Sequence, residues 1–440
     1  MAAARAEAMR LRATVRAILF LGAIRALGGC SDDLHQVPVP YDAAPLPGTH
    51  GRAAPRPELS VQRARKICQL IGDRDAARGR PIANASEARF GVIGTDLGIT
   101  VEHDRKLVFL FGDTWNRQEP WSLSMPGADA FATLPADADA VDACHHLAFA
   151  YDGSAQGFAP ITLDGLPLPT FEVPTGAFAT AHHLYAFFTV ADAWGHTIGD
   201  RGGRGILARS TGDQSFETVR PVSATSERFN MVSAAVAPAG RYPELPAAWA
   251  SRALVLAYGT GHYRESFPRL ALAEANHPDE PWIYFAGWDA SGAPRFAPDE
   301  ESSMPLFPDE PSQACVGEMS VAWAPHIERW LMTYNCRGRI LLRAARAPWG
   351  PWSQSTVLFD KKGPESVGVL HRTCARFAPP CDDANVSPSF GGSVAGDPYG
   401  SYLIPSFFSS NAPGRERIVF TMSTWNPYTT VLMEAELATK

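Results

Sequence analysis

The chain has 440 residues, of which 45% are hydrophobic and 19% charged, and its formal net charge is −7. This composition supplies enough apolar material for a sizeable core. It gives no electrostatic case for a nucleic-acid-binding protein, because such proteins usually carry a basic face. The 37 glycines and 37 prolines indicate many short elements joined by turns rather than long helices.

Residues 1–29 have the pattern of a secretory signal peptide, because arginines precede the short apolar run Ala17–Ile24 and small residues precede Cys30. Cys30 resembles the lipidated cysteine of a bacterial lipobox, although Arg25 puts a charge close to the cleavage site. An ordinary signal peptide and a start codon assigned too early are the alternatives. No later stretch reaches the ~20 apolar residues of a membrane helix. We therefore expect an exported lipoprotein of the cell envelope, held to the membrane by the lipid on Cys30 alone.

The segment after the signal peptide, residues 30–60, is rich in Pro, Ala, Gly and Asp and has no apolar period. Such a composition is typical of a flexible tether. A single folded domain is expected over residues 61–440. At its start, apolar and basic residues alternate at helical spacing over Val61–Asp73, and this spacing predicts a short helix.

The remaining cysteines are candidates for disulfides, because export leads to an oxidising compartment. Besides Cys30 the chain contains Cys68, Cys144, Cys315, Cys336, Cys374 and Cys381. Six cysteines allow 15 pairings. The sequence favours a local bridge between Cys374 and Cys381, which flank a Pro-Pro loop. The second choice is a bridge between Cys315 and Cys336, which lie on neighbouring expected strands.

From about residue 88 one pattern recurs: a strand of small residues, a turn, a strongly apolar strand and an edge strand. Five such units begin with strands expected over 90–101, 174–180, 230–236, 318–323 and 391–395. The fifth unit continues with strands expected over 402–407, 417–423 and 430–435.

Repeated units of this kind predict a closed radial array, because closure removes the exposed sheet edges that an open sheet of this size would leave. We therefore predict an all-β fold, a single five-bladed β-propeller. A four- or six-bladed propeller and a large β-sandwich are the alternatives.

Three acidic residues stand out against their apolar surroundings. Asp96 lies within a strand of the first unit, Asp113 ends the next strand, and Glu318 opens the fourth unit. A carboxylate in an apolar strand is costly unless it has partners or faces water, and the inner strands of a propeller converge on a central cavity. The structural alternatives are a turn-capping role for Asp113 and a salt bridge from Glu318 to Arg337 or Arg343.

Acidic groups that meet across a funnel suit glycoside cleavage, which needs one carboxyl group to protonate the leaving oxygen and another to act as base or nucleophile. A partly desolvated carboxyl group would also have the raised pKa that a general acid needs. In this hypothesis Asp113 is the nucleophile or base, and Asp96 or Glu318 is the acid.

Polar and aromatic residues recur where the apolar strands end, and they predict a sugar-binding rim. An aromatic ring offers a stacking face, and amides and hydroxyls offer hydrogen bonds. Packing within the loops is the alternative role. The candidates are Trp115, Asn116, Tyr263, Arg264, Trp425, Asn426 and Tyr428, with Thr175 and Asn230 from the second and third units.

No cofactor and no metal site are expected. The histidines in the pairs His145-His146 and His182-His183 are adjacent, so in a strand each pair would point to opposite faces. The sequence contains no Gly-rich phosphate loop, no Ser-His-Asp signature and no nucleophile elbow.

Six motifs occur in a fixed order over about residues 85–437. They are GTDLG at 94–98, FGDTW at 111–115, PTGAF at 174–178, GEMSV at 317–321, APWGPW at 347–352 and STWNPY at 423–428. Together they resemble a bacterial propeller family catalogued as domain of unknown function 4185. Members of that family include endo-acting D-arabinanases of glycoside hydrolase family 183, which cut mycobacterial arabinan. The resemblance implies a five-bladed propeller with paired aspartates in the first blade. These match Asp96 and Asp113 here, with Glu318 as a further acidic site residue.

The sequence therefore predicts an exported, monomeric glycoside hydrolase that cleaves a cell-envelope or environmental polysaccharide, with arabinan as one candidate. The alternative is a non-catalytic carbohydrate-binding or scaffold propeller at the cell surface. In that case the same carboxylates would only accept hydrogen bonds from sugar hydroxyls.

Overall fold

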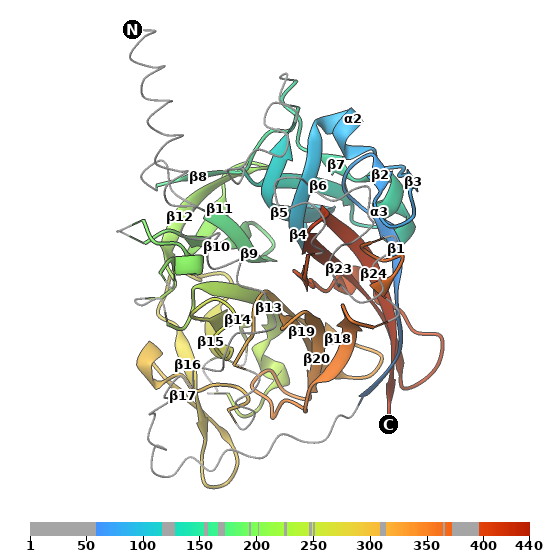
Figure 1. Ribbon diagram of the computed structural model, residues 1–440. Coiled ribbons are helices and arrows are strands. Elements are labelled where there is room, and N and C mark those ends of the chain that lie inside the picture. The colour runs from blue at the N-terminus through green and yellow to red at the C-terminus, as the bar shows by residue number, and fades with distance from the viewer. Residues whose placement is uncertain are drawn as a thin grey trace, which may run out of the picture.

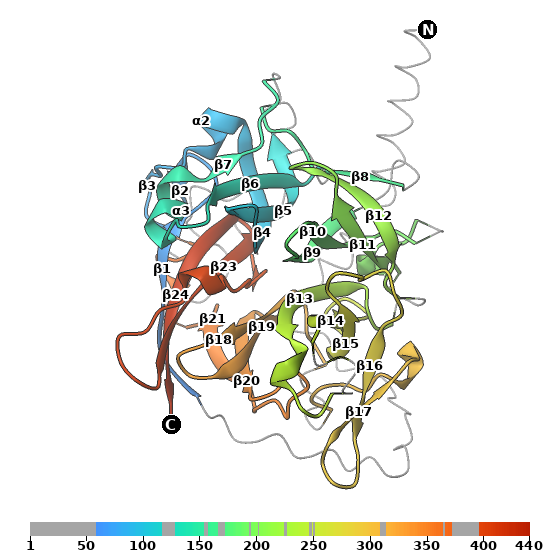
Figure 2. The ribbon, with the colours of Figure 1, turned by 180° about the vertical axis from the view of Figure 1, so that it is seen from behind.

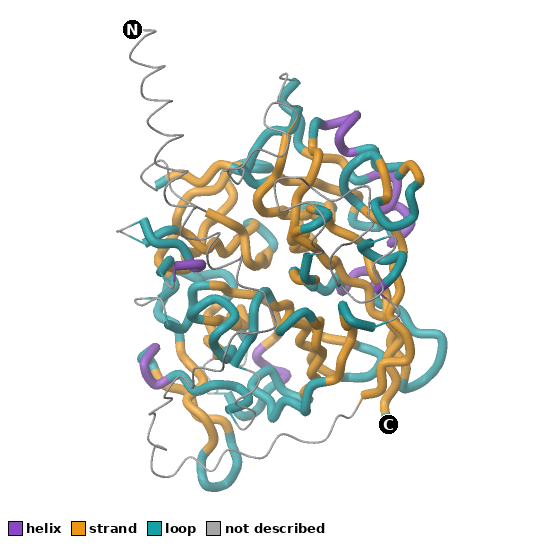
Figure 3. Tube along the Cα trace, in the orientation of Figure 1, coloured by secondary structure: helices purple, strands orange, loops and turns teal. Residues whose placement is uncertain are grey.

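The computed structural model describes residues 59–440, apart from 117–127, 154–156, 166–171, 193–194, 201, 224–226, 246–248, 250, 309–313, 364–365 and 372–395. Strands dominate this part of the chain, and its helices are few and short (Figure 3). Within it, no helix is long and apolar enough to span a membrane. The signal peptide, the lipidation site Cys30 and nearly all of the tether lie outside the described residues and stay predictions.

Five sheets surround one axis (Figures 1 and 2), which confirms the predicted five-bladed β-propeller. Blade one consists of β4 (Val92–His103), β5 (Lys106–Asn116), β6 (Ala130–Pro135) and β7 (Ala148–Phe149). Blade two consists of β9 (Glu172–Ala179), β10 (Leu184–Val190), β11 (Arg204–Ser210), β12 (Ser215–Pro221) and β8 (Thr162–Asp164). Blade three consists of β13 (Met231–Pro238), β14 (Ala253–Thr260), β15 (Arg269–Glu274), β16 (Ile283–Trp288) and β17 (Pro294–Ala297).

Blade four consists of β18 (Met319–Ala324), β19 (Arg329–Cys336), β20 (Arg339–Ala345) and β21 (Thr356–Asp360). Blade five consists of β22 (Pro398–Tyr399), β23 (Arg415–Trp425), β24 (Tyr428–Thr439) and β1 (Leu59–Gln69). The smaller elements include β2 (Arg74–Asp75), β3 (Arg80–Pro81), α2 (Ser86–Phe90), α3 (Ala140–His146) and a 3-10 helix, η8 (Pro405–Phe407).

The position of a strand within its blade explains its composition. Second strands such as β10 are buried on both faces between neighbouring blades, so their sequences are continuous apolar runs rather than alternating ones. Inner strands lie where the blades approach the axis, and there small residues are required. A Cβ atom added to Gly176 of β9 would lie 2.3 Å from the carbonyl oxygen of Val232 in β13.

The N-terminal strand closes the propeller, and this corrects the helix that we expected over Val61–Asp73. β1 pairs antiparallel with β24, from Leu59 opposite Thr439 to Gln69 opposite Val431, and the two lie side by side in Figure 1. The ladder has irregularities between Val61 and Arg63 and between Lys66 and Cys68. Each irregularity shifts the alternation of side chains, so the apolar positions lose their period of two and imitate helical spacing.

The predicted start of blade five also differs from the structure. The strand expected over 391–395 lies outside the described residues. The strand expected over 402–407 is replaced by a single bridge at Leu403 and the 3-10 helix η8. Because Pro405 cannot donate a ladder hydrogen bond, a regular strand is disfavoured there.

Two disulfides tie the described residues together. Cys315–Cys336 joins the segment before β18 to the end of β19, as the second choice from the sequence had it. Cys68–Cys144 joins the end of β1 to α3 of blade one, which the sequence analysis did not single out. The bridge expected between Cys374 and Cys381 lies outside the described residues. Disulfides are typical of proteins from oxidising compartments.

The double variant Cys68→Ser/Cys144→Ser is expected to lose about 2–4 kcal/mol of unfolding free energy, because the bridge limits the unfolded chain. Cys68 and Cys144 are 76 residues apart in the sequence, whereas Cys315 and Cys336 are 21 apart, and a bridge that closes a longer loop stabilises more. The variant Cys315→Ser/Cys336→Ser is therefore the matched control and should lose less. Chemical denaturation of the three proteins measures both losses. A smaller loss for the Cys68 variant would contradict the role assigned to the closing strand.

Candidate active site

The predicted acidic residues lie at one end of the propeller axis, and strand direction is the reason. Inner strands begin at this end and second strands finish there. Asp96 lies near the start of β4, Asp113 near the end of β5, and Glu318 directly precedes β18. The fold thus brings carboxyl groups of blades one and four to the same mouth.

Asp96 is buried and is bonded to blade five. The β4–β5 register shifts on both sides of it, and Leu97 and Gly98 have φ angles of +65° and +90°. Such bulges turn a side chain out of the regular alternation. The Tyr399 hydroxyl of β22 donates a hydrogen bond of 2.7 Å to Asp96 Oδ2. The other oxygen, Oδ1, is also buried and lies against Gly112 of β5, so the whole carboxyl group is held at the junction of blades one and five.

Asp113 is held in a strained backbone conformation beside Asp96. Its φ angle is +26°, a value that costs free energy for a residue with a side chain. Its N–H donates a hydrogen bond of 2.9 Å to Oδ1 of Asp129, which stabilises this conformation. A Cβ atom on the preceding residue, Gly112, would lie 2.7 Å from Asp96 Oδ1, so a larger residue there would displace the Asp96 carboxyl group.

Two acidic residues of this group were missed by the sequence analysis. Asp129 directly precedes β6 and is 4% exposed, and burial and the charges of Asp113 and Glu172 raise its pKa well above the ordinary value. Glu172 is the first residue of β9. It stands at the start of its inner strand as Glu318 does in blade four, but we expected that strand to begin two residues later. A search for acids at strand starts would have found both.

Glu318 is fixed by two residues of the β14–β15 loop in blade three. The Tyr263 hydroxyl donates a hydrogen bond of 2.7 Å to Glu318 Oε1, and Arg264 Nη2 lies 3.4 Å from Oε2. The ion pair is therefore formed with Arg264, and the alternative pairing with Arg337 or Arg343 is wrong. A contact between loops of different blades has no local signal in the sequence.

The surroundings separate the pKa values of the two paired aspartates. Burial raises the pKa of Asp96 to about 6, against hydrogen bonds from Tyr399 and Tyr428 that favour its ionised form. Burial, followed by the charges of Asp96 and Glu172, raises the pKa of Asp113 well above the ordinary value. Every cause that acts on Asp113 favours its protonated form. Acidic groups that share a desolvated site cannot all ionise, and the hydroxyl donors at Asp96 together with the acidic neighbours of Asp113 favour the arrangement with the proton on Asp113.

The sugar-binding candidates divide between the site and the protein interior. Tyr263, Arg264 and Tyr428 lie at the carboxyl groups and act on Glu318 or Asp96. The ring of Trp115 is 1% exposed, so its expected stacking role is replaced by packing, because a buried ring presents no face to a sugar.

Other candidates hold strands and turns together. Thr175 Oγ1 donates a hydrogen bond to the carbonyl oxygen of Val232, and the N–H of Val232 donates one to Thr175 Oγ1. Each is 3.1 Å long, and together they join β9 to β13. Asn230 Nδ2 donates a hydrogen bond of 3.2 Å to the carbonyl oxygen of Gly202. The remaining candidates are Asn116, half-buried at the end of β5, Trp425, half-buried at the end of β23, and Asn426, buried in the β23–β24 turn.

A cavity of about 230 Å³, here named the axial cavity, lies further along the inner strands from the carboxyl groups. It is lined by residues of β4, β9, β13 and β18, together with Tyr402 and Leu403. In the described ranges, no three or more His, Cys, Asp or Glu side chains are grouped so that they could hold a metal ion.

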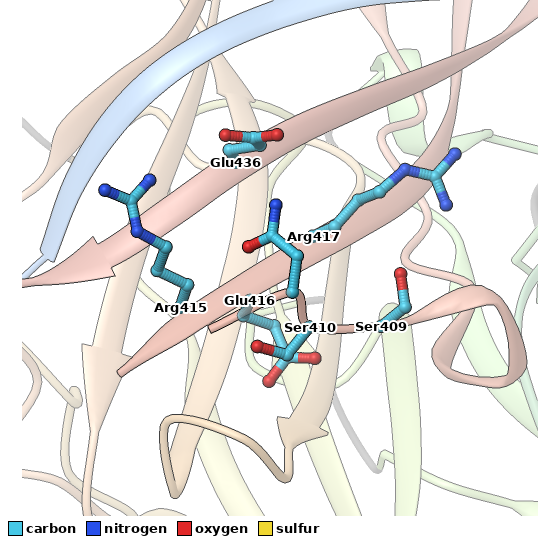
Figure 4. Close-up of a pocket in the computed structure, with 7 residues that line it drawn as sticks. Ser409, Ser410, Arg415, Glu416, Arg417 and Glu436 are labelled. Carbon is cyan, nitrogen blue, oxygen red and sulfur yellow. The ribbon is translucent and has the colours of Figure 1, made fainter. Parts of the chain in front are cut away.

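A smaller pocket of about 100 Å³ lies at the start of β23, the end of that strand opposite to the site (Figure 4). Its charged groups are largely paired. Glu416 accepts a hydrogen bond of 2.9 Å from the N–H of His326, and its other oxygen lies 2.7 Å from His326 Nδ1. Arg417 pairs with Glu434. This pocket therefore joins blades four and five and is separate from the carboxyl groups.

A family model described as a domain of unknown function (DUF4185) matches residues 82–434. No curated protein matches the sequence. Among solved structures, the chain is similar to a candidate hydrolase from Bacteroides ovatus, with 12% identity, 79% of this chain and 87% of that chain covered, and a TM-score of 0.48. It is also similar to an exo-1,5-α-L-arabinanase from a bovine ruminal metagenomic library, with 11% identity, 78% of this chain and 93% of that chain covered, and a TM-score of 0.35. A third similar structure is the catalytic domain of a GH62 α-L-arabinofuranosidase from Coprinopsis cinerea, with 12% identity, 89% of this chain and 98% of that chain covered, and a TM-score of 0.38.

Asp96→Asn is expected to stabilise the protein at neutral pH. The folded state holds the Asp96 proton up to about pH 6, whereas an unfolded aspartate loses it near pH ~3.9. The wild-type protein therefore loses unfolding free energy as pH rises from about 4 to about 6, because only the unfolded state releases this proton easily. The variant has no proton at this position and shows no such loss. Relative to wild type, its unfolding free energy should increase between pH 4 and pH 7 by about 1–3 kcal/mol.

Urea denaturation at both pH values measures this difference, with Asp213→Asn as the control, because the Asp213 side chain is 66% exposed. The control should show nearly the same difference from wild type at each pH. A pH-independent difference for Asp96→Asn as well would contradict the raised pKa of Asp96.

Proposed function

The chain belongs to the DUF4185 family, and on this premise we propose that it is a glycoside hydrolase that cleaves a polysaccharide with the carboxyl groups of Asp96 and Asp113. The observation that carries the proposal is a pair of carboxyl groups at the mouth of the propeller in unlike surroundings: Asp96 lies opposite Gly112, the residue before Asp113, and accepts a hydrogen bond from the Tyr399 hydroxyl, whereas the neighbours that act on Asp113 are acidic. Glycoside cleavage needs one protonated and one ionised carboxyl group, and their different surroundings divide these two roles.

In the proposed reaction Asp113 is the acid and gives its proton to the glycosidic oxygen as the bond to the anomeric carbon breaks. Asp96 is the ionised partner and acts on the opposite side, either as base toward water or as nucleophile. Tyr399 orients Asp96 through its hydrogen bond. This reverses the roles in the sequence-based hypothesis, because the Tyr399 hydroxyl favours ionised Asp96 and only acidic neighbours act on Asp113.

Glu318 has a binding role in this proposal. Its ion pair with Arg264 and its hydrogen bond from Tyr263 keep it in one orientation. An ionised carboxylate accepts hydrogen bonds only, so it suits sugar hydroxyls. Asp129 acts through Asp113, whose N–H it accepts. We therefore treat Asp129 as a positioning residue.

We further propose that the protein is exported and that Cys30 carries its lipid anchor. The support is the small-residue pattern before Cys30 and two disulfides in the folded part, which suit an oxidising compartment. Arabinan is the first polysaccharide to test, because the six motifs resemble a family that includes arabinanases.

Purified wild-type protein is expected to release oligosaccharides from arabinan or from another member of a polysaccharide panel. Asp113→Asn and Asp96→Asn should each lower kcat by about 10²–10⁴-fold, the usual contribution of a positioned acid or base. Asp213→Asn, on the exposed surface, should retain full activity. NMR of the first product reports its anomeric configuration and so separates base from nucleophile for Asp96.

The pH profile should be bell-shaped if the two carboxyl groups divide the roles in this way. The rate falls below pH about 6, because Asp96 gains its proton, and falls again at higher pH as Asp113 loses its proton. Both apparent values belong to the coupled pair. Binding of polysaccharide without release by the wild type would overturn the hydrolase and leave a carbohydrate-binding propeller.

A further inference from the structure

We propose that the axial cavity stores and delivers the water that hydrolyses the substrate, and that Tyr402 passes this water to the carboxyl groups. The inference rests on the proposed hydrolase function and deepens it. It assigns a role to the cavity and to a tyrosine that the proposed chemistry does not otherwise use.

The first support is position. The cavity is lined by Ile99 and Thr100 in β4 and begins at Ser320 in β18. Asp96 precedes Ile99 by three residues, and Glu318 precedes Ser320 by two. At ~3.3 Å per residue along a strand, the cavity lining therefore begins within about 10 Å, measured along the backbone, of both Asp96 and Glu318.

The second support is the side chain of Tyr402. It lines the cavity, its residue is 3% exposed, and its hydroxyl has no hydrogen-bond partner among the residues that the structure describes. Burial, and then the charges of Glu318 and Asp96, raise the pKa of this hydroxyl well above its ordinary value. Tyr402 thus borders the cavity and also lies near enough to Glu318 and Asp96 to be affected by their charges. Buried hydroxyls are normally hydrogen-bonded, so we expect a water molecule to bind this one.

The third support is the character of the cavity. Its volume is about 230 Å³, which leaves room for several water molecules at ~30 Å³ each. Thr100, Ser233 and Ser320 contribute hydroxyls to a lining that otherwise has small or apolar side chains. Buried water requires such polar partners, whereas a wholly apolar cavity stays dry.

The cavity solves a problem that a polymeric substrate creates. A polysaccharide chain bound across the mouth covers the carboxyl groups and blocks water from that side. Water from the cavity reaches the reacting centre past Tyr402. With Asp96 as the base, the water oxygen bonds to the anomeric carbon while the bond from that carbon to the glycosidic oxygen breaks. One water proton goes to Asp96 and the glycosidic oxygen takes the proton of Asp113, so protons and charge balance. Tyr402 accepts and donates hydrogen bonds and has no net proton change.

Filling the cavity tests the proposal. Ser233 is 5% exposed and lines the cavity; Ser233→Leu occupies the water space, and Ser233→Ala is the matched control that leaves it open. On the polysaccharide that the wild type cleaves, Ser233→Leu should lower kcat by about tenfold or more with little change in KM, as expected when a reacting group is displaced. Tyr402→Phe should lower kcat in the same way, and Ser233→Ala should remain within about twofold of wild type.

The dependence of the rate loss on substrate length separates the water route from a general structural defect, which would slow short and long substrates alike. A disaccharide leaves part of the mouth open to solvent, so Ser233→Leu should slow its hydrolysis less than that of the polymer. If Ser233→Leu does not fold, Thr100→Phe fills the cavity from blade one. A folded filling variant with wild-type kcat on the polymer would overturn the water route.

A crystal structure of the wild-type protein at high resolution provides a test that needs no activity. Ordered water in the axial cavity, hydrogen-bonded to Tyr402 Oη, supports the proposal, and a dry cavity overturns it. A wild type without activity on every polysaccharide would instead remove the hydrolase proposal. The two failures are therefore distinguishable.

Discussion

Carboxylates repel one another most strongly where water is excluded, and this repulsion acts at one end of the propeller axis. Asp96, Asp113 and Asp129 come from one blade, and Glu172 comes from the next. Burial raises the pKa values of the three aspartates, and the charges of neighbouring acidic groups raise those of Asp113 and Asp129 further. Such a group is unfavourable for folding, and hydrogen bonds from the Tyr399 hydroxyl and the Asp113 N–H offset part of that cost. The same crowding keeps a proton on one acid while its neighbour is ionised.

The architecture opposes that repulsion from outside the site. The closing strand β1 pairs with β24, and the Cys68–Cys144 bridge attaches its end to blade one, where the aspartates lie. Within the site, Tyr399 and Arg264 supply the compensating hydroxyl and charge. Both come from blades other than blade one. An open arrangement of the same sheets would keep the three aspartates of blade one together but would remove Glu172, Tyr399 and Arg264 from them, so closure of the propeller and the proton affinity of these aspartates are linked.

The sequence predicted the features that depend on local pattern. Five units with apolar second strands gave the propeller, because a strand covered on both faces is a continuous apolar run. Asp96, Asp113 and Glu318 were singled out as candidates because each interrupts such a pattern. β1 was not predicted as a strand, because two irregularities in its ladder imitate helical spacing. Asp129 precedes its strand and interrupts nothing, and the partner of Glu318 comes from a loop of another blade. Contacts of that kind depend on the tertiary fold and have no signal in the local sequence.

The carbon-13 NMR titration of the aspartate carboxyl groups tests the central claim most directly. The account predicts a midpoint near pH 6 for Asp96 and one for Asp113 well above the ordinary ~3.9. It also predicts that Asp96→Asn lowers the midpoint of Asp113, because a neighbouring negative charge is removed. Midpoints near pH ~4 for both residues, unchanged when the other is replaced, would contradict it.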